Sequence, residues 1–434
     1  MAAKKKNSTT RVSGTPNMMK IRVRMYRVGF GDCFLLSLPS GSKKGDAYAH
    51  ILIDFGVHSG ADIGTMDKII DDIAQVTKRK LAIIIATHAH QDHISGFGRY
   101  AELFSSFKID QIWLPWTWDE SNLKAMKLHE KLEIVAEELL RRFALLPVSP
   151  EREAAMMAVE NLRGNKKSMH HLRTGFGDND VKIRFLKAGD LLNSTDCFIP
   201  GLRVRVLGPP ELEEYLKKMD PPDDDRYLIS KAANDIALAA YTSSHLFGKE
   251  WIADSEYHAL SQEDEETLQK MAEFSFELAF SLDKARNNES LVTLFEFHGK
   301  NLLFTGDAQY GNWRWWIENI PSAEDILSNI NFFKIAHHGS ENATPVSALE
   351  KMADGNFVSM VSTQSKPWEP IPLVSLMARV NQKTKEKIVR SDWLDWPDAP
   401  VPRDDAQPTL PSKFAQGFTK GRFWFDYEID LMKK

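Results

Sequence analysis

The stretch LAIIIATHAHQDH, residues 81–93, joins a continuous apolar run to four residues of the kinds that bind metals. The run is rich in β-branched residues and indicates a buried strand. His88, His90, Asp92 and His93 follow it in the pattern H-x-H-x-D-H. Imidazole nitrogens and carboxylate oxygens together suit zinc, and also manganese or iron. We expect a rigid strand with a metal site at its end. A polar loop with fortuitous histidines is the alternative, which this density of ligands disfavours.

Two later strands are predicted to end in the same kinds of residue. LLFTGD, residues 302–307, ends at Asp307, and INFFKIAHHGS, residues 330–340, contains His337 and His338. Either motif alone is weak evidence, because TGD is common in turns and paired histidines are common on surfaces. In layered α/β folds, however, strand ends converge on one edge. We therefore expect the three segments to meet at one metal centre.

Composition limits the class of protein. The 434 residues are 43% hydrophobic and 26% charged, as in a globular protein, and the net charge is −5. This charge argues against a surface that grips nucleic acid non-specifically, although it leaves room for a local basic groove. Cys33 and Cys197 fit no metal-finger spacing and suit a reducing compartment. No apolar run reaches about 18 residues, so we expect no membrane span, no membrane partner and a cytoplasmic protein.

Apolar periodicity predicts strands interspersed with helices, which is typical of an α/β fold. The expected strands are 20–26, 34–38, 50–56, 81–88, 109–115, 181–186, 202–210, 290–299, 300–307, 330–340 with its loop, 355–363 and 421–431. The expected helices are 65–78, 100–107, 121–144, 151–162 and one within 264–282.

The same patterns predict the domain organisation. We expect a disordered tail at 1–18, a main domain at 19–395, and a Pro-rich linker with a terminal strand at 396–434. Two insertions, mainly helical, interrupt the main domain at about 119–178 and 211–286. Such large insertions are candidate contact surfaces for a protein partner.

In content and order, these motifs resemble the metallo-β-lactamase-fold hydrolases. More narrowly, the sequence is similar to the soluble domain of ComEC-type competence proteins and to phosphorylcholine esterases. The resemblance extends from about residue 19 to residue 392, outside the insertions, and implies a four-layer αββα sandwich. The matching segments, in order, are VGFGDCFLL, ILIDFG, THAHQDHISGFG, VLGPP, NNESLV, LLFTGDA, KIAHHGS and IVRSD.

The resemblance implies a site for two divalent metal ions, zinc or manganese. His88 and His90 would hold the first ion, Asp92 and His93 would hold the second, and Asp307 would bridge both. Two metals about 3.5–4 Å apart can share a hydroxide and lower its pKa toward neutrality. That hydroxide would attack a phosphorus or carbonyl centre, and Asp92 would also orient it.

One of the two later histidines would complete the second metal site. We favour His338 over His337 because His338 directly precedes the glycine, and we assign catalytic roles to His338 together with Asp92 and Asp307. Asp54 would steady the histidine loop by hydrogen bonding. Further positions that would line the site are Asp32, Asn287, Ser290 and Ser340.

The resemblance is incomplete at three places. Many enzymes of this fold have a further histidine ligand, but VLGPP carries Gly208 there, and His170, His171 and His245 are more typical of surface residues. The related branch also has a late His-Pro pair, where this chain has Ile371-Pro372, and a glutamate where it has Gln309.

Two features near the motifs have two interpretations each. The tryptophans at 113, 116 and 118, and at 313, 315 and 316, favour core packing over stacking on bases or a cation. The basic stretch 163–173 fits either a solvated loop or a contact to phosphates.

We expect a phosphodiesterase or nuclease that acts on a phosphoester substrate such as nucleic acid. One alternative is a carboxyl-type hydrolase of a lactam, lactone or thioester. A second is an iron site that reduces oxygen or nitric oxide, which requires a flavin partner. A third is a non-hydrolytic binding component of a larger assembly.

Overall fold

The computed structural model describes residues 20–40, 47–58, 61, 64–163, 165–178, 180–227, 274–279, 282, 284–364, 371–393 and 417–432. The predicted tail, the Pro-rich linker, His245 and much of the second predicted insertion lie outside these residues. No helix in the described ranges is long and apolar enough to cross a membrane.

The first sheet contains eight strands within the described residues, in the order β14-β15-β1-β2-β3-β4-β5-β6. Neighbours from β14 to β3 are antiparallel, and those from β3 to β6 are parallel. The terminal strand β15 pairs with β1 along the whole length of β1. The bounds are β1 Lys20–Tyr26, β2 Phe34–Pro39, β3 Tyr48–Ile53, β4 Lys80–Ile85, β5 Lys108–Pro115, β6 Lys182–Leu186, β14 Phe418–Lys420 and β15 Trp424–Asp430.

The second sheet contains seven strands of the described chain, in the order β13-β12-β11-β10-β9-β8-β7. Strands β7 to β10 are antiparallel to their neighbours, whereas β10 to β13 are parallel. The bounds are β7 Leu191–Leu192, β8 Leu202–Gly208, β9 Val292–Phe297, β10 Lys300–Phe304, β11 Phe332–Lys334, β12 Val358–Val361 and β13 Ile388–Arg390.

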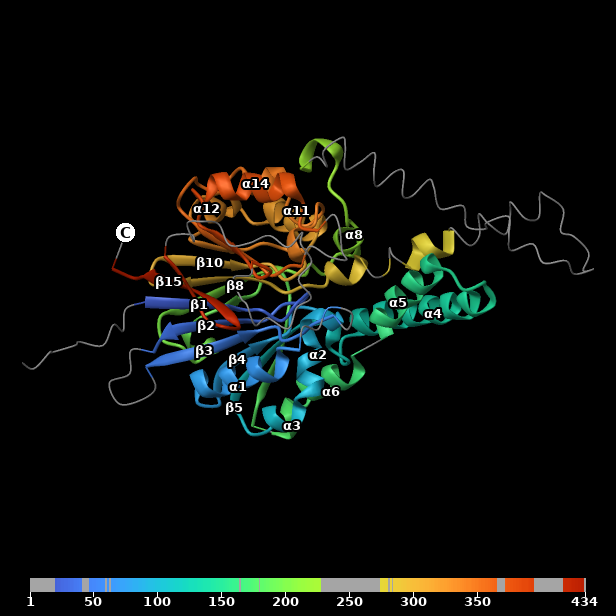
Figure 1. Cartoon of the computed structure of the whole chain (residues 1–434), viewed down its shortest axis with the longest axis horizontal. Coiled ribbons are helices and arrows are strands. Elements are labelled where there is room, and N and C mark those ends of the chain that lie inside the picture. The colour runs from blue at the N-terminus through green and yellow to red at the C-terminus, as the bar shows by residue number, and fades with distance from the viewer. Residues whose placement is uncertain are drawn as a thin grey trace, which may run out of the picture.

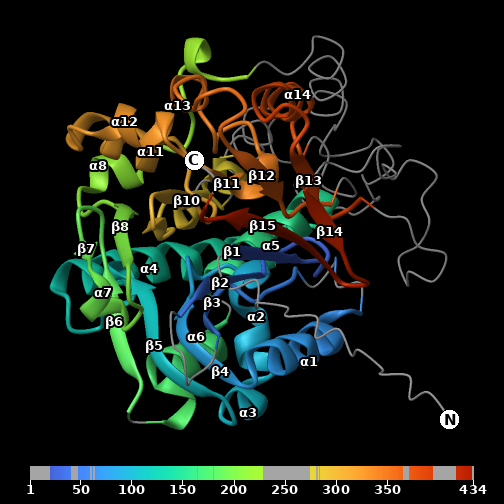
Figure 2. The same ribbon diagram turned by 90° about the vertical axis from the view of Figure 1, so that its left-hand side faces the viewer.

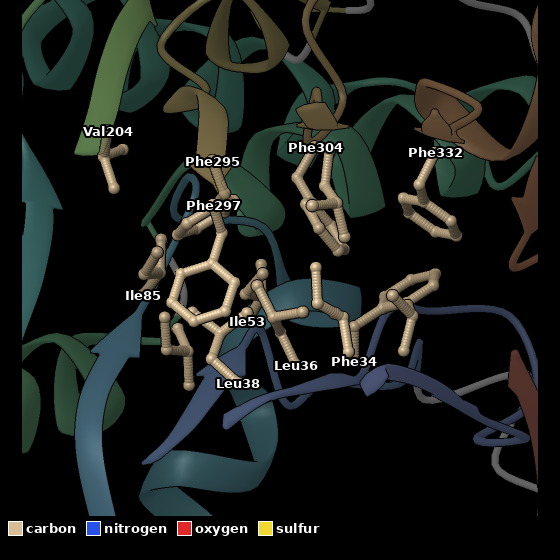
Figure 3. Close-up of a cluster of buried hydrophobic side chains, with 14 of the residues drawn as sticks. Phe34, Leu36, Leu38, Ile53, Ile85, Val204, Phe295, Phe297, Phe304 and Phe332 are labelled. Atoms are coloured by element: carbon tan, nitrogen blue, oxygen red, sulfur yellow. The ribbon is translucent and has the colours of Figure 1, made fainter. Parts of the chain in front are cut away.

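The two sheets pack face to face through a large apolar core (Figure 3). Alternate residues of β2, such as Phe34 and Leu36, enter this core, while Leu35 between them faces the opposite side of the sheet. Phe295 and Phe304 approach from the second sheet. Because both faces of β2, β3 and β4 are covered, these strands are continuous apolar runs rather than alternating ones.

Helices cover the outer face of each sheet (Figures 1 and 2). Helices α1 (Met66–Thr77), α2 (Gln91–Arg99), α3 (Ala101–Phe104) and α6 (Lys166–Arg173) pack on the first sheet. Helices α11 (Tyr310–Asn319), α12 (Ala323–Ser328) and α14 (Val374–Lys383) pack on the second sheet. Shorter helices are α7 (Ser194–Cys197), α8 (Glu213–Leu216) and α13 (Val346–Leu349).

Helices α4 (Leu123–Leu145) and α5 (Pro150–Arg163) extend away from the sheets as an arm (Figure 1). Leu139 and Phe143 of α4 pack against Val159 of α5 in a separate apolar cluster. Phe276 and Ala279, from the second predicted insertion, complete this cluster. Residues of the two predicted insertions therefore share one small core.

The chain is a mixed α/β protein with two mixed sheets, which confirms the broader prediction of fold class. One local prediction was wrong. The sequence led us to expect no helix between residues 88 and 100, yet Gln91–Arg99 form α2, because Ile94 and Phe97 on one face of it are buried. The structure also excludes a solvated loop for most of the basic stretch, since Lys166–Arg173 form α6, which packs on α2 and buries Met169 and Leu172.

Candidate metal centre

Three strands, each paired in parallel with a neighbour, place the ligand-type residues at one site. Strand β4 leads into residues 86–90 and helix α2, β10 leads into Thr305–Asp307, and β11 leads into residues 335–338. The first segment belongs to one sheet, and the other two belong to the second sheet. Their carboxyl ends meet where the sheets face each other. The predicted meeting of strand ends is therefore what the fold produces.

Four side chains from these segments form a buried group that could hold a metal ion: Asp92, His93, Asp307 and His338. His338 Nε2 lies 2.9 Å from Asp92 Oδ2 and 3.4 Å from Asp307 Oδ2. His93 Nε2 lies 3.1 Å from Asp307 Oδ2 and 3.7 Å from Asp92 Oδ2. Donor atoms around a divalent ion with bonds of about 2.0–2.2 Å are separated by roughly 3–3.5 Å. The spacing in this group matches that requirement.

Two further observations fit a cation at this position. His93 Nε2 is buried and has no hydrogen-bond partner, although Asp307 Oδ2 is close to it. Four carboxylates, of Asp32, Asp54, Asp92 and Asp307, are at most 8% exposed here, and among the described residues the ammonium of Lys334 is the one that pairs with any of them. The carboxylates outnumber this ammonium, and buried charge of one sign requires compensation by cations or protons. The donor set therefore fits a divalent metal.

The ligand-type side chains are held from behind by hydrogen bonds. His338 Nδ1 donates to the Ser362 carbonyl oxygen at 2.8 Å, which leaves Nε2 facing the carboxylates. His93 Nδ1 donates to Asp54 Oδ2 at 2.8 Å, and Asp54 also accepts from the Thr87 amide at 2.8 Å. Such outer contacts fix the ring orientation and the tautomer of a ligating histidine. These hydrogen bonds of Asp54 agree with the role that the family resemblance implied for it.

His88 and His90 occupy the flank of the four-residue group. His88 Nε2 and His90 Nδ1 are 3.0 Å apart, and the His88 ring lies 4.1 Å from the His93 ring, centroid to centroid. Ser290 Oγ lies 3.3 Å from His88 Nδ1 and accepts from the Asp307 amide at 3.1 Å. In the described chain, the groups of three or more clustered ligand atoms do not include either histidine.

The remaining predicted site residues lie around the centre without joining the four-residue group. His337 is half-buried, with Nε2 3.5 Å from Asn287 Nδ2 and Nδ1 3.4 Å from Asn342 Oδ1. Ser340 Oγ donates to the same Asn342 oxygen at 3.0 Å. Of the two adjacent histidines, the structure thus brings His338 into the group and leaves His337 beside it.

Lys334, on β11, is the site residue that the motifs did not reveal. Its ammonium is buried, pairs with Asp32, and donates to the Gly306 carbonyl oxygen at 2.7 Å and to Asp307 Oδ1 at 3.3 Å. Asp32 in turn lies 3.7 Å from His93 Nδ1 and forms a second cluster with Asp54 and His93. A lone lysine inside the apolar strand INFFKIA was the available signal, because lysine is rarely buried without a partner.

Backbone constraints explain why Gly306 precedes Asp307. Gly306 has φ of 52°, and a Cβ there would lie 2.9 Å from Thr87 Cβ and 3.1 Å from Ser290 Cβ. Glycine alone accepts this conformation at such close approach. The ligand-bearing loop of the second sheet can therefore pack directly against that of the first.

Electrostatics of the centre favour the ionised form of the Asp307 carboxylate. Although burial opposes ionisation, His93, His338 and Lys334 hold the pKa of Asp307 well below its usual range. Burial, together with the neighbouring His93 and His90, lowers the pKa of His88 well below its usual value. His88 is thus neutral, which is the form of imidazole that binds metals.

Comparison with known proteins adds no assignment, because neither protein-family models nor curated proteins match this sequence.

Proposed function

We propose that this chain is a metal-dependent hydrolase of the metallo-β-lactamase fold that cleaves phosphodiesters, as a nuclease or a related phosphodiesterase. The observation that carries the proposal is the buried group of Asp92, His93, Asp307 and His338. The ordered match of motifs to phosphoester-cleaving members of that fold supports the substrate class. The arrangement of two sheets with helices outside is compatible with it.

In this proposal the four-residue group holds one divalent ion, and His88 and His90 contribute to a second beside it. Such ions supply Lewis acidity toward a phosphoryl oxygen and lower the pKa of water. Asp92 and His90 retain 8% and 7% exposure, whereas His88, His93 and His338 have none. Substrate therefore approaches from the side of Asp92 and His90, and the buried histidines serve only as fixed ligands.

The rest of the centre keeps these ligands in place. Asp54 orients His93, the Ser362 carbonyl orients His338, and Lys334 anchors the Asp307 carboxylate on the side away from the histidines. Preorganised groups of this kind contribute to catalysis because they need not reorganise when charge develops.

Neither cysteine competes as a nucleophile. Cys33 is buried, and burial raises the pKa of its thiol well above the usual range. Burial likewise raises the pKa of Cys197 to about 12. Both thiols stay protonated near neutral pH, and the thiolate is the reactive form. This favours direct attack by water over a covalent thiol intermediate.

The test is hydrolysis of bis-(p-nitrophenyl) phosphate and of a labelled DNA strand by metal-free protein and by protein loaded with manganese or zinc. We expect turnover only after loading, with loss of at least about a hundredfold in Asp307→Ala. Asp71→Ala, an exposed aspartate on α1, is the matched control and should keep full activity. Absence of turnover in loaded wild-type protein would overturn the phosphodiesterase assignment and direct attention to lactones and thioesters.

A further inference from the structure

A cleft with a volume of about 770 Å³ lies between the helical arm and helix α6. Its walls come from α4, α6, the 3-10 turn Trp116–Trp118 and Arg286. The lining side chains include Trp118, His129, Arg173 and Arg286, together with Lys166 and Glu133, which form an ion pair at 3.4 Å. Helix α4 of the arm thus supplies one wall of the cleft, and helix α6 supplies another.

Two chain segments connect this cleft to the candidate metal centre. Arg286 opens the turn that ends at Ser290, whose hydroxyl contacts both His88 and the Asp307 amide. On the α6 side, Asn165 Nδ2 donates to the Ala89 carbonyl oxygen at 2.9 Å, next to Lys166 of the cleft wall. Residues of the cleft wall are therefore only a few positions along the chain from residues that contact the loop carrying the metal-type ligands.

Two donor nitrogens of the lining side chains, Trp118 Nε1 and Arg173 Nε, are buried without a hydrogen-bond partner among the described residues. Trp118 is fully buried, so its indole N–H has no access to bulk water. A buried donor that lacks an acceptor costs about 1–3 kcal/mol. A ligand rich in acceptor oxygens would satisfy such donors.

Basic and acidic side chains both line the cleft: Lys166, Arg173 and Arg286 occur together with Asp119, Glu120 and Glu133. Arg286 is buried and pairs with the buried Glu289 at 3.3 Å, and Glu289 also accepts from the Thr117 hydroxyl at 2.9 Å. Within the described residues, Arg173 forms an ion pair with Glu120, whose side chain is 77% exposed, so that water screens this contact. Burial and the nearby Arg286 guanidinium lower the pKa of Arg173, against the opposing effects of Glu120 and Asp119. In this part of the chain Arg173 thus has no buried carboxylate as an ion-pair partner.

We propose that this cleft binds a phosphate group of the substrate other than the one that is cleaved, through the guanidinium of Arg173 supported by Arg286 and the Trp118 indole. This inference rests on the proposed phosphodiesterase function and specifies a substrate with at least two phosphates, such as a nucleic acid strand. Guanidinium is the side chain best suited to phosphate, because its planar donors match two phosphate oxygens.

The test is calorimetric titration of metal-free protein with deoxythymidine 3′,5′-bisphosphate, with inorganic phosphate and thymidine as comparison ligands. We expect the bisphosphate to bind at least about tenfold more tightly than either. Arg173→Gln should weaken bisphosphate binding at least about tenfold. Arg141→Gln, on the exposed face of α4 with its side chain 73% exposed, is the matched control and should bind as wild type.

A second variant separates ligand binding from a structural role for the ion pair. Glu120→Gln removes the carboxylate that competes for Arg173, so it should tighten bisphosphate binding if Arg173 binds phosphate. If Arg173 serves only to pair with Glu120, this variant leaves the affinity unchanged and the inference is overturned. Equal affinities of wild type and Arg173→Gln overturn it as well, and equal binding of inorganic phosphate overturns the assignment to a substrate phosphate.

Because the titration uses no metal and no turnover, its failure is distinct from failure of the proposed function. Asp307→Ala, which should abolish hydrolysis, should bind the bisphosphate as wild type. Loss of binding in Arg173→Gln together with unchanged hydrolysis of bis-(p-nitrophenyl) phosphate is the combination that supports both proposals.

Discussion

His338 Nε2 lies 2.9 Å from Asp92 Oδ2, although the two residues are 246 positions apart in the chain. Asp92 lies in the first turn of α2, which follows β4 of the first sheet. His338 follows β11 of the second sheet. The metal-type ligands therefore bridge the interface between the two sheets. A metal ion bound there would link both halves of the sandwich, so its binding free energy would add to the free energy of unfolding.

Asp54 should control metal affinity without itself belonging to the four-residue group. In Asp54→Asn, one acceptor oxygen becomes a donor, so the hydrogen bonds from the Thr87 amide and His93 Nδ1 cannot both persist. We expect metal affinity to fall about 10- to 100-fold, as for other outer contacts of metal ligands. Competition with a fluorescent chelator measures it, with Asp71→Asn as the control; equal affinities in both variants would refute this role.

Lys334 should stabilise the fold, and more so when metal is absent. Lys334→Met removes the ammonium that pairs with Asp32 and Asp307, which leaves these buried carboxylates without their lysine partner. We expect a loss of about 3–5 kcal/mol in the free energy of unfolding of metal-free protein. Urea denaturation with and without manganese checks this, and metal should recover part of the loss. If saturating metal leaves the loss of unfolding free energy unchanged, Lys334 and the metal do not compensate the same carboxylates.

The C-terminal strand should be held by a buried ion pair. Arg24 Nε and Nη2 donate to Asp426 at 2.7 and 2.8 Å, and the guanidinium carbon lies 3.8 Å from the Trp424 ring centroid. Asp426→Ala leaves Arg24 buried without this partner, so we expect a loss of about 3–5 kcal/mol in unfolding free energy. Glu428→Ala, which breaks more exposed pairs on the same strand, should cost less than about 1 kcal/mol. Similar losses of unfolding free energy in the two variants would argue against a larger contribution from the buried pair than from the exposed pairs.

Acid should remove the stabilising effect of Glu350. Hydrogen bonds from Arg379, with further contributions from Tyr227 and Lys383, lower the pKa of this carboxyl from 4.5 to about 2. A carboxylate whose pKa is lower in the folded state stabilises it above the unfolded value, and this stability is lost as pH falls through the folded value. The gap in unfolding free energy between wild type and Glu350→Gln should thus be constant above pH 5 and shrink toward pH 2. A gap that is independent of pH would contradict the pairing.

Strand ends were the part of the site that the sequence could predict. A buried strand that is followed at once by ligand residues can be recognised from the local sequence pattern. This is the case at His88–His93, Asp307 and His338. Convergence of these ends follows from parallel topology and needs no knowledge of loop conformation. For that reason the residues that meet were predictable from the sequence pattern, whereas their assignment to two metal ions came from the family resemblance and stays a prediction.

Contacts that depend on tertiary packing could not be predicted. Helix α2 contains two glycines, which disfavour a helix in isolation, yet burial of Ile94 and Phe97 stabilises it. One of these, Gly98, allows close approach of α6, since a Cβ there would lie 2.5 Å from Ser168 Oγ. The carbonyl of Ser362 orients His338 through a backbone atom, so no side-chain identity could have revealed it.

The tryptophans show how burial decides between two interpretations. Trp113, Trp313 and Trp316 are fully buried in the apolar cores, which confirms the prediction of core packing for them. Trp118 is buried too, yet it also lines the cleft. Sequence alone could not separate these cases, because the cleft forms only where α4 and α6 are brought beside it.

The central claim is that Asp92, His93, Asp307 and His338 hold a catalytic metal ion, and elemental analysis of purified protein tests it most directly. Protein dialysed against manganese or zinc and then against metal-free buffer should retain at least one equivalent of metal per chain. Asp307→Ala treated in the same way should lose it, while Asp71→Ala should retain it. Wild-type protein without bound metal, or an equal metal content in Asp307→Ala, would contradict the account.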